Sequence, residues 1–147
     1  MTLRARLACL SLSLGLALAG CGERRGPLAP MEDHLGDWVL INYWAEWCKP
    51  CIREVPELNS LDEEKNITVL GVNYDGATGE ALAGQIEALD IAFAQLPADP
   101  AAELGIDRPQ VLPTTVVIDP DGRRVATLVG PQTAESLRKA MADSGDS

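Results

Sequence analysis

Apolar positions along this chain fall into two patterns, one typical of strands and one of helices. Short apolar runs rich in Val and Ile, bounded by Gly, Pro, Asn or Asp, indicate strands buried in a sheet. Longer segments with apolar residues three or four positions apart indicate helices packed along one face. The predicted strands are residues 38–44, 67–74, 91–96, 114–119 and 125–129. The predicted helices are residues 50–65, 79–89 and 133–141, with a helical turn over residues 99–104.

The order of these segments predicts an α/β fold with a mixed sheet. Strands and helices alternate in the first part of the chain, which favours parallel pairing. The turn sequence Pro120-Asp121-Gly122 joins the last two strands, so these are expected to form an antiparallel hairpin. Thr133 is the expected cap of the closing helix, and Pro56 is expected to kink the first helix.

The first part of the chain has the features of a lipoprotein signal. Two arginines precede an apolar run that is too short for a transmembrane helix and is typical of a secretory signal. The run ends in Leu-Ala-Gly-Cys at residues 18–21, which resembles a bacterial lipobox. Residues 1–20 are therefore a predicted signal peptide, and Cys21 is the predicted lipidation site. By the same resemblance, Gly22 in place of Asp implies the outer membrane of a Gram-negative cell.

The rest of the chain is long enough for one domain. We expect a tether over residues 21–30, a globular domain over residues 31–142 and a polar tail over residues 143–147. Without residues 1–20, the chain carries 10 basic and 22 acidic residues, so its net charge is −12. This balance leaves no basic patch for nucleic acid, and attachment to a membrane is expected to come from lipid.

The sequence Trp47-Cys48-Lys49-Pro50-Cys51 indicates a dithiol redox site at a strand-to-helix turn. Pro50 suits the first turn of a helix, which puts Cys48 just ahead of the N-terminus, where backbone N–H groups favour a thiolate. Lys49 adds a nearby positive charge. We expect Cys48 to be the exposed attacking or attacked sulfur and Cys51 to resolve the mixed disulfide. Trp47 is expected to shield the sulfurs from water.

The other cysteines do not change this interpretation. Cys9 lies inside the predicted signal and Cys21 would carry lipid, which leaves only Cys48 and Cys51 as thiols. In an exported protein, a solitary CxxC is more typical of redox chemistry than of structural cross-linking. A closed zinc site needs four ligands, and beyond these two thiols the chain offers only His34. No metal and no cofactor is predicted.

Two motifs resemble those of TlpA/ResA-type thioredoxin-like proteins. Residues 41–51 with 54–58 carry the first motif, and residues 112–115 with 118–122 carry the second. The resemblance covers about residues 37–141 and implies a thioredoxin fold for the domain, with a central mixed β-sheet flanked by helices. It also implies an exported, membrane-tethered disulfide reductase with disulfide-bearing protein substrates. Since the extracytoplasmic space lacks a general reductant, a membrane electron donor of the DsbD/CcdA type is implied as well.

The resemblance assigns roles to residues outside the CxxC. It implies a cis peptide bond before Pro113 that faces the cysteines, with Leu112 offering backbone groups to an extended substrate segment. Thioredoxin has a buried Asp six residues before its first active cysteine, and here that position is Asn42. Another acid or water must therefore handle the proton of Cys51. Asp75, at the end of a predicted strand, is the candidate, although it also suits a simple turn before a glycine.

Three functions remain open. The leading hypothesis is a lipid-anchored reductase on the periplasmic side of a bacterial membrane. The second is a disulfide oxidant or isomerase, because Lys49 would stabilise the thiolate and raise the reduction potential; the apolar Leu112 and the TlpA-like pattern count against it. The third is a metal-binding chaperone lipoprotein. Copper-delivering relatives of this fold use a wider CxxxC and a downstream histidine, and this chain has no histidine after His34.

Overall fold

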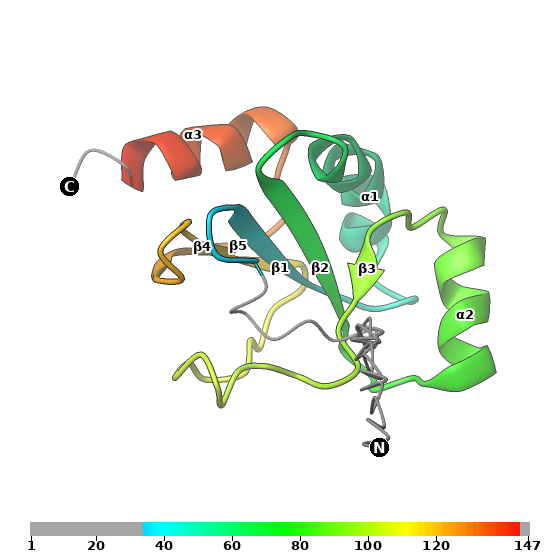
Figure 1. Cartoon of the computed structure of the whole chain (residues 1–147). Helices are drawn as coiled ribbons and strands as arrows, with labels where there is room; N and C mark the ends of the chain where they lie inside the picture. Colours follow the sequence, from blue (N-terminus) through cyan, green and yellow to red (C-terminus); the bar gives the residue numbers. More distant parts are fainter. Residues whose placement is uncertain (1–33, 145–147) are drawn as a thin grey trace, which may run out of the picture.

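Strands and helices alternate in the first half of the described chain and give way to a hairpin in the second (Figure 1). The computed structural model describes residues 34–144. The strands are β1 (Trp38–Trp44), β2 (Ile67–Asn73), β3 (Ala94–Gln95), β4 (Thr114–Ile118) and β5 (Arg124–Val129). The helices are α1 (Lys49–Asp62), α2 (Gly79–Ala88) and α3 (Ala134–Ser144). The predicted signal peptide, the tether and the lipidation site Cys21 lie outside the described residues.

The sheet of the described residues has the strand order β3-β2-β1-β4-β5. The pairs β1–β2 and β2–β3 are parallel, whereas β1–β4 and β4–β5 are antiparallel, which confirms the predicted mixed sheet and hairpin. Tyr43, near the end of β1, lies opposite Thr114 at the start of β4. The chain that follows β1 and the chain that precedes β4 therefore leave the sheet at the same edge. These are the two segments that carry the cysteines and Pro113.

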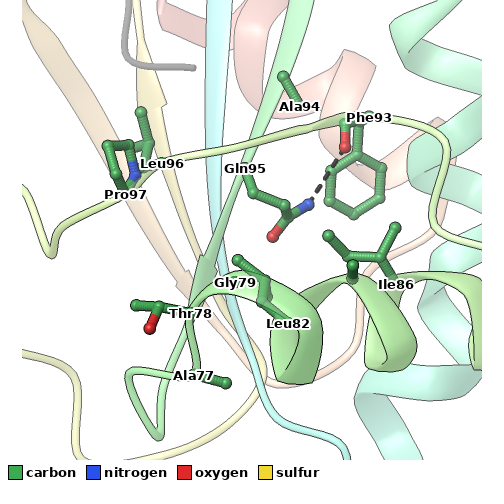
Figure 2. A pocket seen from close by; sticks show the side chains of 11 residues that line it. Ala77, Thr78, Gly79, Leu82, Ile86, Phe93, Ala94, Gln95, Leu96 and Pro97 are labelled. Carbon is green, nitrogen blue, oxygen red and sulfur yellow. Dashed lines mark hydrogen bonds between the residues drawn. The ribbon is translucent and has the colours of Figure 1, made fainter. Parts of the chain in front are cut away.

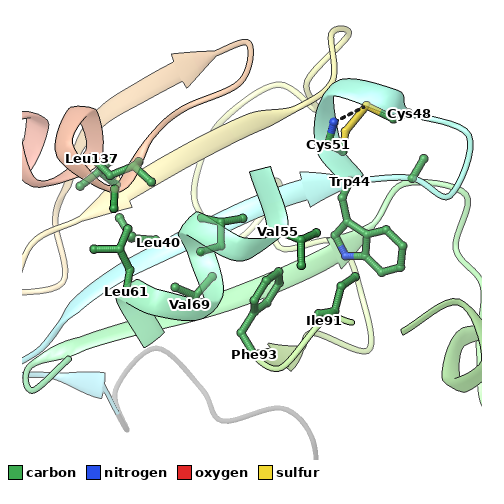
Figure 3. Packing of buried hydrophobic residues seen from close by; sticks show 14 of the residues in the cluster. Leu40, Trp44, Cys48, Cys51, Val55, Leu61, Val69, Ile91, Phe93 and Leu137 are labelled. Carbon is green, nitrogen blue, oxygen red and sulfur yellow. Dashed lines mark hydrogen bonds between the residues drawn. A yellow bond between two sulfur atoms is a disulfide. The ribbon is translucent and has the colours of Figure 1, made fainter. Parts of the chain in front are cut away.

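The main core lies between the sheet and helices α1 and α3, which cover the same face (Figures 1 and 3). Apolar spacing along α1 buries Val55, Leu58 and Leu61 against this face, and burial of each such side chain contributes roughly 1.5–3 kcal/mol. A second cluster, centred on Val116 and Ile41, fills the opposite face. There the loop of residues 97–112, rather than a helix, supplies part of the cover through its apolar side chains.

Strand β3 is shorter than the predicted strand over residues 91–96. Only Ala94–Gln95 pairs with β2. The backbone of the preceding residues instead bonds the side chain of Asn59 on α1: its Nδ2 donates to the carbonyl of Asp90 over 2.7 Å, and its Oδ1 accepts from the N–H of Ala92 over 2.9 Å. These two bonds hold the segment against α1 and leave it out of the sheet.

The helices differ from the predicted ones mainly at their ends. Helix α1 ends at Asp62, not at residue 65, and continues through Pro56. Helix α3 runs past the predicted end at residue 141, and an ion pair between Lys139 and Asp143 of 2.6 Å supports its last turn. The cap at Thr133 is confirmed, because its Oγ1 accepts from the N–H of Ser136 over 3.1 Å. Within residues 34–144, no helix is long and apolar enough to span a membrane.

Candidate active site

Cys48 and Cys51 form a disulfide at the N-terminus of α1, with Cα atoms 5.3 Å apart. Cys48 is the residue that caps this helix, as the proline at residue 50 predicts. Its Sγ accepts a hydrogen bond of 3.3 Å from the backbone N–H of Cys51. When the disulfide is reduced, the free N–H groups and the positive end of the helix dipole stabilise a thiolate on this sulfur.

Burial of the two cysteines differs from the expectation of an exposed Cys48. Cys48 is 4% exposed and Cys51 is 3% exposed, so both belong to the main core cluster (Figure 3). Trp44 and Ala45, which come shortly before Cys48 in the chain, are buried in the same cluster.

That second segment ends in a cis peptide bond between Leu112 and Pro113, as the sequence motif predicts. Pro113 is buried and directly precedes β4, while Leu112 is half-buried. The antiparallel register between β1 and β4 brings this bond to the edge from which the CxxC segment emerges. Leu112 also packs against the cluster that contains both cysteines. The structure thus brings together the two motifs that are 62 residues apart in the sequence, counted from Cys51 to Pro113.

Trp47 and Asp75 form a pair on the surface beside the cysteines. Trp47 is 64% exposed, and its Nε1 donates to Asp75 Oδ2 over 2.8 Å. Asp75 is exposed, so its hydrogen bond goes to the indole and not to a cysteine. The sequence suggested Asp75 as the acid for Cys51, and the structure gives it instead a contact that holds Trp47. Lys49 is exposed on the first turn of α1.

The acid nearest to Cys51 along α1 is Glu54, one turn further into the helix. Glu54 is 1% exposed and has no basic partner among its hydrogen bonds; it accepts from Asn42 Nδ2 over 3.3 Å and from the N–H of Gln132 over 3.0 Å. Burial raises the pKa of Glu54 to about 7, although these two hydrogen bonds lower it. Residues three apart on a helix share a face, so Glu54 and Cys51 both point into the core.

Sequence reasoning gave Glu54 no role, although the residue was part of the first motif. The signal that could have found it was a charged residue at a core position of α1, between Cys51 and Leu58. A buried carboxyl with a raised pKa beside a nucleophile is typical of a functional proton acceptor. Asn42, in place of an Asp, is 2% exposed and donates to both Glu54 and Thr115, the latter over 3.0 Å. The buried carboxyl therefore lies on α1, while β1 carries an amide at Asn42.

An apolar groove of about 460 Å³ lies between α2 and β3 (Figure 2). Leu82 and Ile86 of α2 line one side, and Phe93 lines the other. The groove is connected to the redox site through Gln95, whose Oε1 accepts from Trp44 Nε1 over 2.8 Å. Gln95 lies so close to Gly71 that a Cβ there would approach its Oε1 to 2.3 Å. Gln95 therefore contacts both Gly71 of β2 and the buried Trp44.

The Cys48–Cys51 disulfide at the N-terminus of a helix, the cis bond before Pro113 and the mixed sheet together define the class of protein. It is a thioredoxin-fold thiol:disulfide oxidoreductase. The chain belongs to the AhpC/TSA family, whose model matches residues 26–125. Membership in this family and the relatives described next confirm the resemblance to TlpA/ResA-type proteins.

Curated relatives and solved structures agree on this class. The chain is 31% identical over 118 residues to the thiol-disulfide oxidoreductase ResA of Bacillus cereus, over 78% of this chain and 68% of that protein. It is 33% identical over 123 residues to the thiol:disulfide interchange protein HelX of Rhodobacter capsulatus, over 81% and 69% of the two chains. A DsbF homologue from Corynebacterium diphtheriae superposes with a TM-score of 0.67 at 28% identity, over 77% of this chain and 75% of that chain.

Proposed function

We propose that this protein is a lipid-anchored, extracytoplasmic reductase of protein disulfides. The observation that carries the proposal is the Cys48–Cys51 pair at the N-terminus of α1, at the sheet edge that also holds the cis Leu112–Pro113 bond. The similarity to ResA and HelX, both named for thiol-disulfide chemistry, supports it. Proteins with disulfides are the substrates, and the backbone of Leu112 is the site where an extended substrate segment pairs.

The reaction needs only the two sulfurs and a proton acceptor. The Cys48 thiolate attacks one sulfur of a substrate disulfide, so the substrate S–S bond breaks, a mixed disulfide forms and one substrate thiolate leaves. The Cys51 thiolate then attacks Cys48 Sγ and releases the second substrate thiolate. The product is the Cys48–Cys51 disulfide that the structure contains. Two electrons pass from the protein to the substrate, and both released thiolates take protons from solvent.

Glu54 is the proposed proton acceptor for Cys51. A thiol has a pKa of about 8.5 and must lose its proton before it attacks the mixed disulfide. A carboxyl with a pKa of about 7 is half ionised near neutral pH and can take that proton inside the core. Its hydrogen bonds to Asn42 and Gln132 fix the carboxyl in place. Trp47 and Lys49 border Cys48, where Lys49 favours the thiolate.

The proposal also includes the source of electrons for the Cys48–Cys51 pair and the location of the protein in the cell. A membrane donor of the DsbD/CcdA type would reduce the Cys48–Cys51 disulfide after each turnover. Lipid on Cys21 would hold the protein on the periplasmic side of a bacterial membrane, the outer membrane if the cell is Gram-negative. The Leu-Ala-Gly-Cys sequence at residues 18–21 and the following Gly22 support this location.

The first test is insulin reduction with dithiothreitol as electron source. The wild-type chain should accelerate precipitation of the insulin B chain, and Cys48→Ser should abolish the acceleration. Cys51→Ser should accumulate a mixed disulfide with insulin, visible on a non-reducing gel. Unchanged turnover in Cys48→Ser would contradict the role of Cys48 as the attacking sulfur.

The direction of electron flow is tested by the reduction potential of the Cys48–Cys51 pair. A value near about −270 mV or lower supports a reductase. The hydrogen bond from the Cys51 N–H to Cys48 Sγ stabilises the reduced thiolate, and this observation favours the second candidate, a disulfide oxidant or isomerase. A potential of about −120 to −180 mV would make that second function the better one.

A further inference from the structure

The loop of residues 97–112 positions the cis bond of the site, and it contains no strand and no full helix. It begins after β3 and ends at Leu112, directly before Pro113. One turn in its first half is closed by the hydrogen bond from the N–H of Leu104 to the carbonyl of Pro100, over 2.9 Å. Its second half must be held by contacts with the rest of the domain, because it has no backbone ladder of its own.

Arg108 makes most of the side-chain polar contacts that attach this second half, and Thr114 Oγ1 adds one to the carbonyl of Val111. Its Nε donates to Asp99 Oδ2 over 2.8 Å, and its Nη2 donates to the backbone carbonyl of Tyr74. The guanidinium carbon lies 3.8 Å from the centre of the Tyr74 ring, which is a cation–π contact. Asp99 in turn accepts from the hydroxyl of Tyr43 over 2.8 Å and from the N–H of Ala101 over 2.9 Å.

Both tyrosines lie where the sheet leads into the redox site. Tyr43 is one residue from the end of β1, and Tyr74 directly follows β2. The N–H of Tyr74 donates to the carbonyl of Trp44 over 2.7 Å, and the next residue, Asp75, holds the Trp47 indole. The end of β2 is thus a shared anchor: Asp75 fixes the CxxC side of the site, and Tyr74 fixes the side that leads to the cis bond.

On its opposite side the same loop is poorly packed. A cavity of about 170 Å³ separates residues 106–111 from β5, and Val129 is among the β5 residues that line it. Val111 and Val129 are 53% and 60% exposed. Residues 108–112 are therefore held from the sheet side: Arg108 makes the contacts described above, Thr114 Oγ1 donates to the carbonyl of Val111 over 2.8 Å, and Leu112 packs against both core clusters.

We propose that Arg108 is a positioning residue for protein substrates, which holds the backbone of Leu112 at a fixed place opposite Cys48. The inference rests on the proposed function, in which an extended substrate segment pairs with Leu112. A shift of about 1 Å in a substrate-positioning group is enough to lower a rate about 100-fold. A small disulfide that reaches Cys48 without pairing to the loop does not need this positioning.

Arginine is suited to this task for a geometric reason. The contacts to Asp99, to the Tyr74 carbonyl and to the Tyr74 ring come from different parts of one planar group. Lysine has a single ammonium on a flexible stem, so it can replace the ion pair but not the whole set. The KM of Arg108→Lys for insulin should therefore lie between the values of the wild type and of Arg108→Ala.

The test compares a protein disulfide with a small one, using the full chain. For Arg108→Ala, kcat/KM for insulin should fall about tenfold or more, mainly through KM, because substrate pairing is lost. The rate at which the reduced protein reacts with 5,5′-dithiobis(2-nitrobenzoate) should stay within about twofold of the wild-type rate, and the reduction potential should not change. Arg108→Lys should show an intermediate KM for insulin. Arg123→Ala is the matched control, since Arg123 also pairs with aspartates but at the opposite end of β4.

Each outcome decides the question. An equal loss with both substrates, or no loss with either, would overturn the positioning role. If Arg108→Ala does not fold, the KM of Arg108→Lys for insulin decides alone: a wild-type value overturns the proposal, and a raised value with an unchanged small-disulfide rate supports it. A wild-type chain that reduces insulin poorly but reacts with the small disulfide would contradict the proposed function instead, because every variant would then be equally poor.

Discussion

At the scale of single residues, the buried carboxyl of Glu54 makes the stability of the folded protein depend on pH. Burial raises its pKa from 4.5 to about 7, so the folded protein binds a proton that the unfolded chain has already released between these pH values. The contribution of Glu54 to the unfolding free energy is therefore greatest at acidic pH, below the pKa of the unfolded chain. It is lost as the pH rises through about 7. The shift corresponds to a loss of about 3 kcal/mol of unfolding free energy.

Glu54→Gln should remove this dependence. The variant loses one good hydrogen bond and should be about 1 kcal/mol less stable at pH 5, but more stable than the wild type at pH 8. Urea unfolding of the oxidised proteins at both pH values measures the crossover. Glu46→Gln, which removes one exposed carboxylate beside the site, should leave the pH dependence of the wild type unchanged. Parallel stability curves for wild type and Glu54→Gln would show that the carboxyl is not protonated in the folded state.

At the scale of elements, Asn59 of α1 decides where β3 begins. Its two hydrogen bonds to the backbone at Asp90 and Ala92 replace two that a longer strand would make with β2. Asn59→Ala should lower the unfolding free energy by about 1–3 kcal/mol, because both backbone groups lose their partner. The amide of Ala92 should also exchange hydrogen faster. Ser60→Ala, an exposed neighbour on the same helix, is the control; equal protection of Ala92 in both variants would contradict the role of Asn59.

The same elements show which parts of the fold a sequence can predict. Strands such as β1 carry their own signal, because a continuous apolar run must be buried on both faces, and β1 was predicted to the residue. The CxxC turn and the cis bond at Pro113 carry local motifs as well. The short β3 depends on a partner distant in the chain, the side chain of Asn59. No pattern of neighbouring residues contains that information.

The candidate site divides in the same way. The two sulfurs and Pro113 could be found from local motifs, whereas Glu54 accepts a hydrogen bond from the N–H of Gln132, 78 residues further along the chain. Arg108 has no signal in its own neighbourhood, because its contacts lead to Tyr74 after β2 and, through Asp99, to Tyr43 on β1. Residues that perform chemistry have recognisable types and spacings, while residues that hold the site in position are defined only by the folded sheet.

At the scale of the whole molecule, charge and lipid should have separable effects on location. Without residues 1–20, the predicted signal peptide, the chain would carry a net charge of −12, which repels anionic lipid surfaces. Retention at a membrane must then come from an anchor, and we expect Cys21 to carry it. In a bacterial host, the wild type should sediment with membranes and stay there in 1 M salt, since lipid anchoring is insensitive to ionic strength.

Cys21→Ser tests this expectation with the redox site left intact. The variant should move to the soluble fraction, lose labelling by a palmitate analogue and still reduce insulin at the wild-type rate. Cys9→Ser, which changes the other cysteine of the leader region, should leave membrane retention as it is. Release of the wild type by salt would show that the attachment is electrostatic, and an unlabelled wild type in the soluble fraction would show an ordinary signal peptide. Because Cys21 is separate from the Cys48–Cys51 pair, either result leaves the thiol chemistry to be judged on its own evidence.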